Sequence, residues 1–176
     1  QAAEFLAKPK FVLEHLPESW RIPAGEDSKS RYSLPSLDSF TLALPNTSAA
    51  GLGFDVSCVV MDEADNHKNL AANLMALKPI IDRGGQLVLV STIDPTQAVS
   101  VFRSIYGKAA FEGKAKNGFR KFFFGFGSVP GEDAKAYEDR RQGADMAQLS
   151  AQGISLDQYM TANFPRTEKE ALEPLK

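Results

Sequence analysis

The sequence contains few of the residues that build disulfides and zinc sites. Cys58 is the one cysteine among 176 residues, so no internal disulfide can form. With two histidines beside it, the chain cannot build a zinc site from Cys and His ligands. No apolar run approaches the roughly 18 residues of a membrane span, so we expect no membrane partner. The net charge of −2 gives no general attraction to nucleic acid, and any such contact has to be local.

The residues that are present indicate a globular chain in which helices and strands alternate. Hydrophobic residues make up 43% and charged residues 24%, and the length fits one domain or a piece of one. Apolar spacing and turn residues predict helices at 2–16, 70–81, 95–106 and within 131–176, strands at 40–44, 56–61, 86–91 and 121–126, and a long loop at 19–37. Pro9 is expected to kink or break the first helix. This order predicts an α/β fold with a mainly parallel sheet and flanking helices.

An apolar strand that ends in two acids is the most informative stretch of the chain. Val59, Val60 and Met61 predict a buried strand, too apolar for an edge, and Asp62 and Glu63 follow directly. Open α/β sheets bind their ligands at the carboxyl ends of strands. Unpaired charges there are costly unless a metal ion or an activated water offsets the cost. The alternative is that the two acids cap the next helix and favour the positive end of its dipole.

The segment from Glu63 to Ser91 has roughly the length of one β-α-β unit. Such a crossover makes its two strands parallel, so their carboxyl ends emerge at one edge of the sheet. Ser91 and Thr92 are therefore expected to face the same crevice as Asp62 and Glu63, where their hydroxyls could sense a γ-phosphate. The alternative is that Ser91 and Thr92 cap the helix expected to begin near Pro95.

Five stretches, in order, resemble the ATPase domain of the large terminase subunit, the DNA-packaging motor of tailed bacteriophages. They are Glu4–Trp20, Leu42–Asp55, the Walker B motif Val59–Ala64, the coupling motif Leu89–Thr92, and Phe124–Asp133 with Asn163–Ala171. The likeness extends over nearly the whole chain. It implies the carboxyl-terminal part of a P-loop NTPase domain of the ASCE or RecA-like class. Residues 1–37 would lead in, 38–128 would form the core, and 129–176 would close the domain.

The resemblance also implies roles and partners. Glu63 would be the catalytic base, Asp62 would hold Mg²⁺ through water, and Ser91 and Thr92 would couple hydrolysis to movement. The implied cofactors are ATP and Mg²⁺, and the implied function is ATP hydrolysis that drives viral DNA into a procapsid. The implied partners are double-stranded DNA, the portal protein, the small terminase subunit and further copies in a ring. The implied location is the host cytoplasm, at the portal vertex, during viral assembly.

The chain departs from the family pattern at the phosphate loop. No Gly-x-x-x-x-Gly-Lys-Ser/Thr sequence occurs in it, although that loop supplies N–H donors and a lysine to the nucleotide phosphates. No stretch matches the family's nuclease domain either. We therefore expect the isolated chain to be inactive and to need a separate chain that carries the phosphate loop. Ala50 stands where the family often has an arginine, so the candidate arginine fingers are Arg21, Arg31 and Arg103.

A basic stretch precedes a run of phenylalanines. The basic residues, with Glu112 as the one acid among them, are Lys108, Lys114, Lys116, Arg120 and Lys121. They are expected either to touch DNA phosphates or a neighbouring subunit, or to form a solvated loop. The aromatic run contains Phe122, Phe123, Phe124 and Phe126. Its continuous apolar context predicts a buried strand rather than a platform on which bases stack.

Two other functions stay open at this stage. Asp62-Glu63-Ala64-Asp65 spells the acidic box of a helicase family, although the arginine-rich helicase motifs are missing. A non-catalytic structural or assembly module is the third interpretation, and the missing phosphate loop supports it. Nucleotide binding would distinguish the two enzymes from the module.

Overall fold

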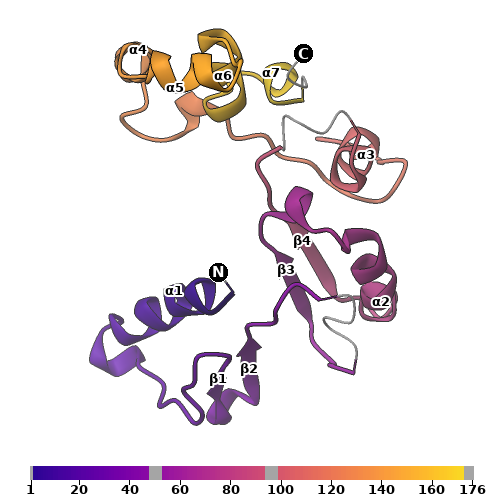
Figure 1. Cartoon of the computed structure of the whole chain (residues 1–176). Helices are drawn as coiled ribbons and strands as arrows, with labels where there is room; N and C mark the ends of the chain where they lie inside the picture. Colours follow the sequence, from indigo (N-terminus) through magenta and orange to yellow (C-terminus); the bar gives the residue numbers. More distant parts are fainter. Residues whose placement is uncertain (1, 48–52, 94–98, 173–176) are drawn as a thin grey trace. The chain divides into compact units, whose positions relative to one another are not determined.

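The computed structural model describes residues 2–47, 53–93 and 99–172 and combines short helices with two two-stranded sheets (Figure 1). The chain divides into two compact units. The first consists of Gln1–Asp55 with Ala72–Arg83, and the second of Val56–Ala71 with Gly84–Lys176. None of the described helices is both long and apolar enough to cross a membrane. That the chain forms part of a single ATPase domain with a P-loop fold stays a prediction.

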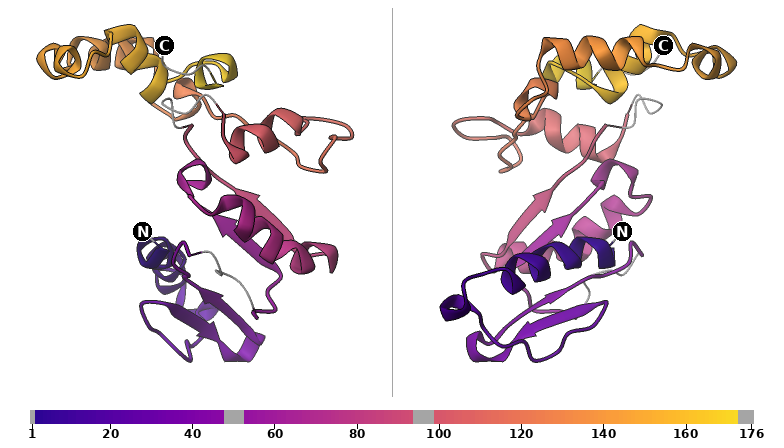
Figure 2. Two further views of the ribbon diagram at one scale, coloured as in Figure 1. Left: turned by 45° about the vertical axis from the view of Figure 1, so that its right-hand side comes forward. Right: turned by 90° about the vertical axis from the view of Figure 1, so that its left-hand side faces the viewer.

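The first unit joins a helix to a hairpin and also includes Ala72–Arg83. α1 (Ala2–Glu14) confirms the predicted helix and continues through Pro9. β1 (Arg31–Leu34) pairs antiparallel with β2 (Ser39–Leu42). β2 confirms the strand predicted at 40–44, with slightly earlier bounds. Two 3₁₀ turns, η1 (Glu18–Trp20) and η2 (Pro35–Leu37), lie before and after β1. α1 lies beside β1, and Figure 2 shows this part from two further sides.

The predicted long loop over residues 19–37 is wrong where it includes β1. Tyr32 in the middle of this strand is buried at 7% exposure. η2 turns the chain back with Pro35 at its start and with Asp38 in the left-handed region at φ 46°. A hairpin therefore closes within a few residues. The sequence did not predict β1 because this strand has only four residues and lies among polar residues and prolines.

The second unit contains the predicted pair of parallel strands. β3 (Cys58–Met61) pairs in parallel with β4 (Gln86–Leu89), with Cys58 opposite Gln86 and Met61 opposite Leu89. α2 (Leu70–Asp82) lies between them in the sequence, although most of it belongs to the first unit. It confirms the predicted helix and the β-α-β order. The carboxyl ends of the two strands consequently lie at the same edge of the sheet.

The prediction of a fully buried β3 is wrong. Met61 is buried, but Val60 is 43% exposed and Cys58 is exposed as well. Within the part of the chain that the structure describes, β3 has β4 as its one strand partner, so its other edge is open. Asp62 is exposed too. The charge of Asp62 is therefore solvated and requires no metal ion to offset a cost of burial.

Five helices follow β4 among the described residues. They are α3 (Val101–Lys108), α4 (Ala134–Gln142), α5 (Met146–Ala151), α6 (Leu156–Asn163) and α7 (Glu168–Leu172). Asp133, Asp145 and Ser155 cap α4, α5 and α6 by accepting hydrogen bonds from backbone N–H groups. Leu149 and Met160 are buried among these helices. The predicted helical character of the closing segment is confirmed as far as residue 172.

Two further expectations differ from the structure. α3 begins at Val101 rather than near Pro95, which lies outside the described residues. Residues 121–126 do not form the predicted third strand, and Phe122 and Phe124 are 56% and 79% exposed. The physical reason is that the apolar run has no strand beside it in the described structure, and apolar composition alone cannot bury a segment. Phe126 instead opens a 3₁₀ turn, η4 (Phe126–Ser128).

Candidate functional site

The acids after β3 lie in a backbone turn of unusual conformation, which we call the acidic turn (Asp62, Glu63, Ala64 and Asp65). Glu63 adopts the left-handed region at φ 52° and ψ 43°, a conformation that costs a residue with a Cβ about 1–2 kcal/mol. Glu63 is one of two non-glycine residues with positive φ in the described structure. Such conformations persist where surrounding contacts impose them, and they are frequent at functional sites.

Contacts with the residues that follow β4 impose this conformation. Ala64 N–H donates to the first carbonyl oxygen beyond β4 over 2.9 Å. Asp65 N–H donates to Ser91 Oγ over 2.9 Å, and Thr92 Oγ1 donates to Glu63 Oε2 over 3.2 Å. The structure thus brings Ser91 and Thr92 to the acidic turn, as the β-α-β unit predicts. Their hydroxyls hold the turn closed.

The hydroxyl protons of Ser91 and Thr92 are engaged in this structure. Ser91 Oγ donates to Thr92 O over 2.6 Å, and a hydroxyl carries one proton. Thr92 uses its proton on Glu63. Either hydroxyl could therefore donate to a γ-phosphate only after it released its present acceptor. The alternative role as caps of α3 is not observed, because Ser100 holds that position.

Asp65 and Ser100 form a contact that the sequence interpretation missed. Asp65 is buried at 6% exposure, and its carboxylate accepts a hydrogen bond from Ser100 Oγ. Ser100 also accepts a hydrogen bond from Arg103 N over 3.0 Å as the N-cap of α3. The pair therefore fastens the acidic turn to the start of α3. Serine before an apolar segment is a strong N-cap signal, but Pro95 suggested an earlier helix start.

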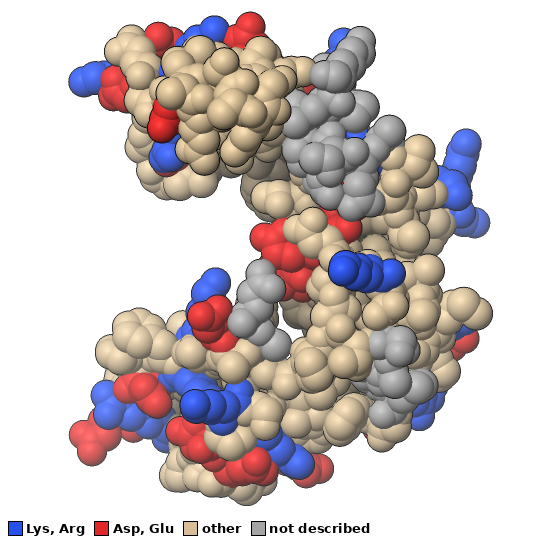
Figure 3. All heavy atoms as spheres, viewed as in Figure 1, with Lys and Arg blue, Asp and Glu red and all other residues tan. Residues whose placement is uncertain are grey.

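Asp62 and Glu63 offer carboxylate oxygens on the accessible side of the acidic turn. In Figure 3, acidic side chains gather over the carboxyl ends of β3 and β4. Mg²⁺ in nucleotide sites uses one or two carboxylates together with waters and phosphates, so the carboxylate of Asp62 fits such an ion in its donor chemistry. The described residues contain no group of three or more His, Cys, Asp or Glu side chains suited to a metal. An ion here would need water or nucleotide phosphates as its other ligands.

Two of the three candidate arginine fingers lie in the first unit and the third in the second. Arg21 donates to a backbone carbonyl of the first unit over 2.7 Å, and Arg31, also in that unit, pairs with Glu26 across 3.4 Å. Arg103 belongs to the second unit, as the acidic turn does, and donates to Leu172 O over 2.7 Å. The backbone N–H of Arg103 completes the cap of α3. Hydrogen bonds therefore connect Arg103 to the acidic turn.

The predicted basic stretch begins at Lys108, the last residue of α3, and continues through the loop that follows. Two backbone hydrogen bonds close its base, from Lys121 N to Ala110 O over 3.0 Å and from Ala110 N to Phe119 O over 3.2 Å. Lys121 pairs with Glu168 across 2.5 Å and lies 5.1 Å from the centre of the Tyr106 ring. Lys121 is therefore engaged within the chain. The exposed members of the stretch are Lys108, Lys114, Lys116 and Arg120.

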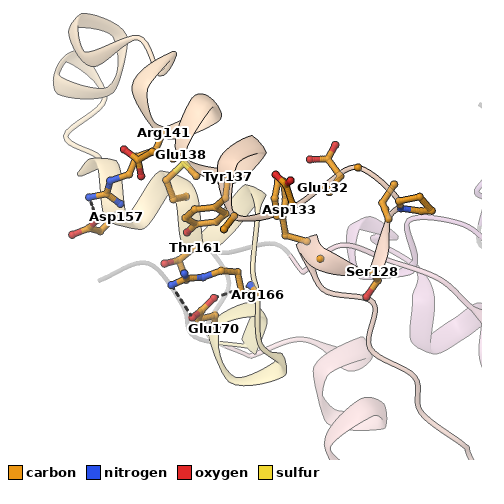
Figure 4. A pocket seen from close by; sticks show the side chains of 17 residues that line it. Ser128, Glu132, Asp133, Tyr137, Glu138, Arg141, Asp157, Thr161, Arg166 and Glu170 are labelled. Atoms are coloured by element: carbon orange, nitrogen blue, oxygen red, sulfur yellow. Dashed lines mark hydrogen bonds and ion pairs between the residues drawn. The ribbon is translucent and has the colours of Figure 1, made fainter.

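An open hollow of about 1130 Å³ lies in the helical end of the second unit (Figure 4). Charged side chains at its rim pair with one another, Arg141 with Asp157 across 2.7 Å and Arg166 with Glu170 across 4.0 Å. A charged ligand would have to compete with these ion pairs. The hollow contains none of the predicted site residues, so the acidic turn remains the stronger candidate for chemistry.

No protein-family model matches this chain, and no curated protein sequence matches it at a significant level. The fold and site define a mixed chain of helices and strands with an acidic turn at the end of a parallel strand pair. A functional assignment therefore depends on the geometry of that turn and on the order of the sequence motifs.

Proposed function

We propose that this chain is the ATPase portion of a terminase large subunit, which hydrolyses ATP with Mg²⁺ to drive viral DNA into a procapsid. The observation that carries the proposal is the contact between Glu63, held in a strained conformation after β3, and Thr92 after β4. An acid and a hydroxyl from two parallel strands then share the edge where α/β sheets bind their ligands. Nucleotide hydrolysis needs such an acid to orient the attacking water.

Each residue at this edge has a role in the proposal. Glu63 accepts a proton from the attacking water, for which its carboxylate is partly accessible. Asp62 would hold Mg²⁺ through water, and a bound ion would supply positive charge to neutralise the phosphates. Thr92 couples hydrolysis to movement, because a γ-phosphate that attracts its hydroxyl would release Glu63 to the water. Ser91 supports the coupling by holding Asp65 and the turn in place.

The proposal includes partners that complete the site. A separate chain that carries the phosphate loop supplies the groups that this sequence lacks. β3 and β4 each have one strand partner among the residues that the structure describes, so each offers an edge to an added strand. Double-stranded DNA, the portal protein, the small terminase subunit and further copies of the chain meet it in the assembled motor. We place that motor at the portal vertex, in the host cytoplasm.

Mg²⁺-dependent ATP hydrolysis tests the proposal. The chain is assayed alone and mixed with a phosphate-loop fragment of a terminase ATPase domain, and size-exclusion chromatography verifies the complex. We expect hydrolysis in the mixture and none from the chain alone. Glu63→Gln should lower the rate by about 10²- to 10⁴-fold, the usual contribution of a general base. Glu138→Gln is the matched control, because Glu138 is an exposed glutamate in α4.

Two results would contradict the proposal. Hydrolysis that survives Glu63→Gln would remove Glu63 as the base. A complex that forms but neither binds nor hydrolyses ATP would remove the ATPase function altogether.

One observation favours a second function, a non-catalytic structural or assembly module. The hydroxyls of Ser91 and Thr92 donate to acceptors within the chain. The hydrogen bonds of these hydroxyls are therefore satisfied without a nucleotide. ATP binding by the complex, measured by calorimetry, would distinguish an enzyme from such a module. A helicase-type enzyme is the third candidate because of its acidic box, and strand-unwinding assays would separate it from a DNA translocase.

A further inference from the structure

Exposed phenylalanines beside the basic loop form a second surface of interest. We define the aromatic–basic surface by six residues: Phe111, Phe122, Phe124, Lys114, Lys116 and Arg120. The three rings are 59%, 56% and 79% exposed, in that order. Apolar side chains gathered on a surface mark interaction sites more often than chance. The sequence predicts burial for Phe122 and Phe124, and their exposure reopens the question of what they contact.

Hydrogen bonds to α3 hold this surface in place. Asn117 Nδ2 donates to Ile105 O over 2.8 Å, and Asn117 Oδ1 accepts from Phe119 N over 3.2 Å. The loop is therefore tied to the helix at one end and closed at its base. The rings of Phe111 and Phe122 consequently meet edge to face, with their centres 6.1 Å apart. Rings that are fixed before binding lose little conformational entropy when a ligand arrives.

Basic side chains in the loop after α3 accompany these rings, with Glu112 as the one acid among them. In the described part of the chain no ion pair engages Lys114, Lys116 or Arg120. The guanidinium of Arg120 lies 5.9 Å from the centre of the Phe122 ring. Figure 3 shows basic side chains projecting at the edge of the molecule near α3. A ligand that fits must therefore carry negative charge together with flat apolar faces.

We propose that the aromatic–basic surface binds single-stranded nucleic acid. Bases stack on Phe122 and Phe124, and the phosphates contact Lys114, Lys116 and Arg120. Single strands satisfy both requirements, because unpaired bases expose their faces while the backbone carries the charge. Bases inside a duplex are covered on both faces and cannot reach the rings. This surface goes beyond the proposed ATPase, since it requires neither ATP nor the acidic turn.

Fluorescence anisotropy tests the proposal with the full chain in the absence of nucleotide. The probes are a labelled oligothymidylate of about 15 nucleotides, within the usual length of such sites, and a duplex of equal length. We expect tighter binding of the single strand, with an affinity that falls as salt rises. Phe122→Ser combined with Phe124→Ser should weaken single-strand binding by about tenfold or more. Lys114→Glu combined with Lys116→Glu should weaken it and reduce its dependence on salt.

Matched controls separate binding from folding. Phe11→Ser replaces a phenylalanine of α1 that is also 59% exposed, and it should leave the affinity unchanged. Circular dichroism melts verify that each variant is folded. Equal affinity for duplex and single strand, or an unchanged affinity in the double phenylalanine variant, would overturn the proposal. If the unmodified chain self-associates and the double phenylalanine variant does not, while both bind the oligonucleotide equally, the surface binds a second copy of the chain. That result would also overturn the proposal.

Discussion

The acidic turn and the aromatic–basic surface are built in opposite ways. In the turn, Ala64 is fully buried, Asp65 is 6% exposed, and contacts from the end of β4 hold Glu63 in a strained conformation. At the aromatic–basic surface the rings are more than half exposed, and backbone bonds fix the base of the loop. Reactions need atoms held in a defined geometry, whereas a stacking surface tolerates many ligand positions. One unit of this chain thus combines a buried, closely connected turn with an exposed surface that tolerates several ligand positions.

Among changes within the acidic turn and the aromatic–basic surface, crowding the turn should lower stability most. Ala64→Leu adds three carbon atoms where the native side chain is 0% exposed, and overpacking of this kind costs about 1–3 kcal/mol. Urea denaturation should show the lower free energy of unfolding. Ala72→Leu, at an exposed position in α2, should change stability by about 0.5 kcal/mol or less. Equal effects at both positions would mean that the turn is not tightly packed.

The strain at Glu63 predicts an unusual preference for glycine. Glu63→Gly and Glu63→Ala both remove the carboxylate, but only alanine keeps a Cβ at φ 52°. We therefore expect the glycine variant to be more stable than the alanine variant by roughly 0.5–1 kcal/mol in the free energy of unfolding, measured by urea denaturation. The same pair at Glu138, inside α4 and exposed, should show the opposite order, because glycine weakens helices by about 1 kcal/mol. If glycine and alanine variants rank in the same order of stability at both positions, the backbone of Glu63 is not strained.

Tyr106 links the aromatic–basic surface to α7 and should make stability depend on alkaline pH. Burial, and next the carboxylate of Glu168, raise the pKa of Tyr106 from 10.0 to about 12. The folded state thus favours the neutral phenol, and this contribution is complete below pH 10 and is lost as pH rises towards 12. Tyr106→Phe should unfold with a flatter pH dependence across this window. Parallel curves for the two proteins, from urea midpoints at pH 9 to 11.5, would contradict the expectation.

The smallest effect should follow from truncating an exposed ring. Phe124→Ala should change the free energy of unfolding by about 0.5 kcal/mol or less, because Phe124 is 79% exposed. Phe102→Ala is the matched comparison, since Phe102 of α3 is 7% exposed and a buried phenylalanine costs about 3–5 kcal/mol on truncation. A cost for Phe124 similar to that for Phe102 would restore the buried strand that the sequence predicts.

The sequence predicted the β3–β4 pair well because local signals decide it. The sequence shows an apolar run, then apolar residues at helical spacing, then a second apolar run. Two strands joined by a helical crossover of this length pair in parallel. That pair brought Glu63 and Thr92 together without any further information. Burial is different, since it depends on which elements lie on either side. Val60 and Phe124 are apolar like core residues, but both are exposed. In the described structure β3 has a strand partner on one side alone, and Phe124 lies outside the two sheets.

The missed contact between Asp65 and Ser100 has a similar cause. Both residues are ordinary polar residues in the sequence, and nothing in their spacing shows that they meet. Their contact depends on where α3 begins, and helix starts are the least certain part of a sequence interpretation. Pro95 suggested a start five residues before Ser100, whereas the structure uses the serine as the cap. The identity of a helix is therefore easier to predict than the residue that fastens it to a site.

The parallel pairing of β3 with β4 also sets the order in which the chain folds. β1 and β2 are joined by a short turn, so they can pair early and with little loss of chain entropy. Glu63 and Thr92 are 29 positions apart, and their contact has to wait for a long loop to close around α2. Contacts between distant positions form more slowly than local ones. In pulsed hydrogen exchange we expect amides of the hairpin to be protected first and those of the acidic turn last. A refolding chain would thus acquire its hairpin before the acidic turn is assembled.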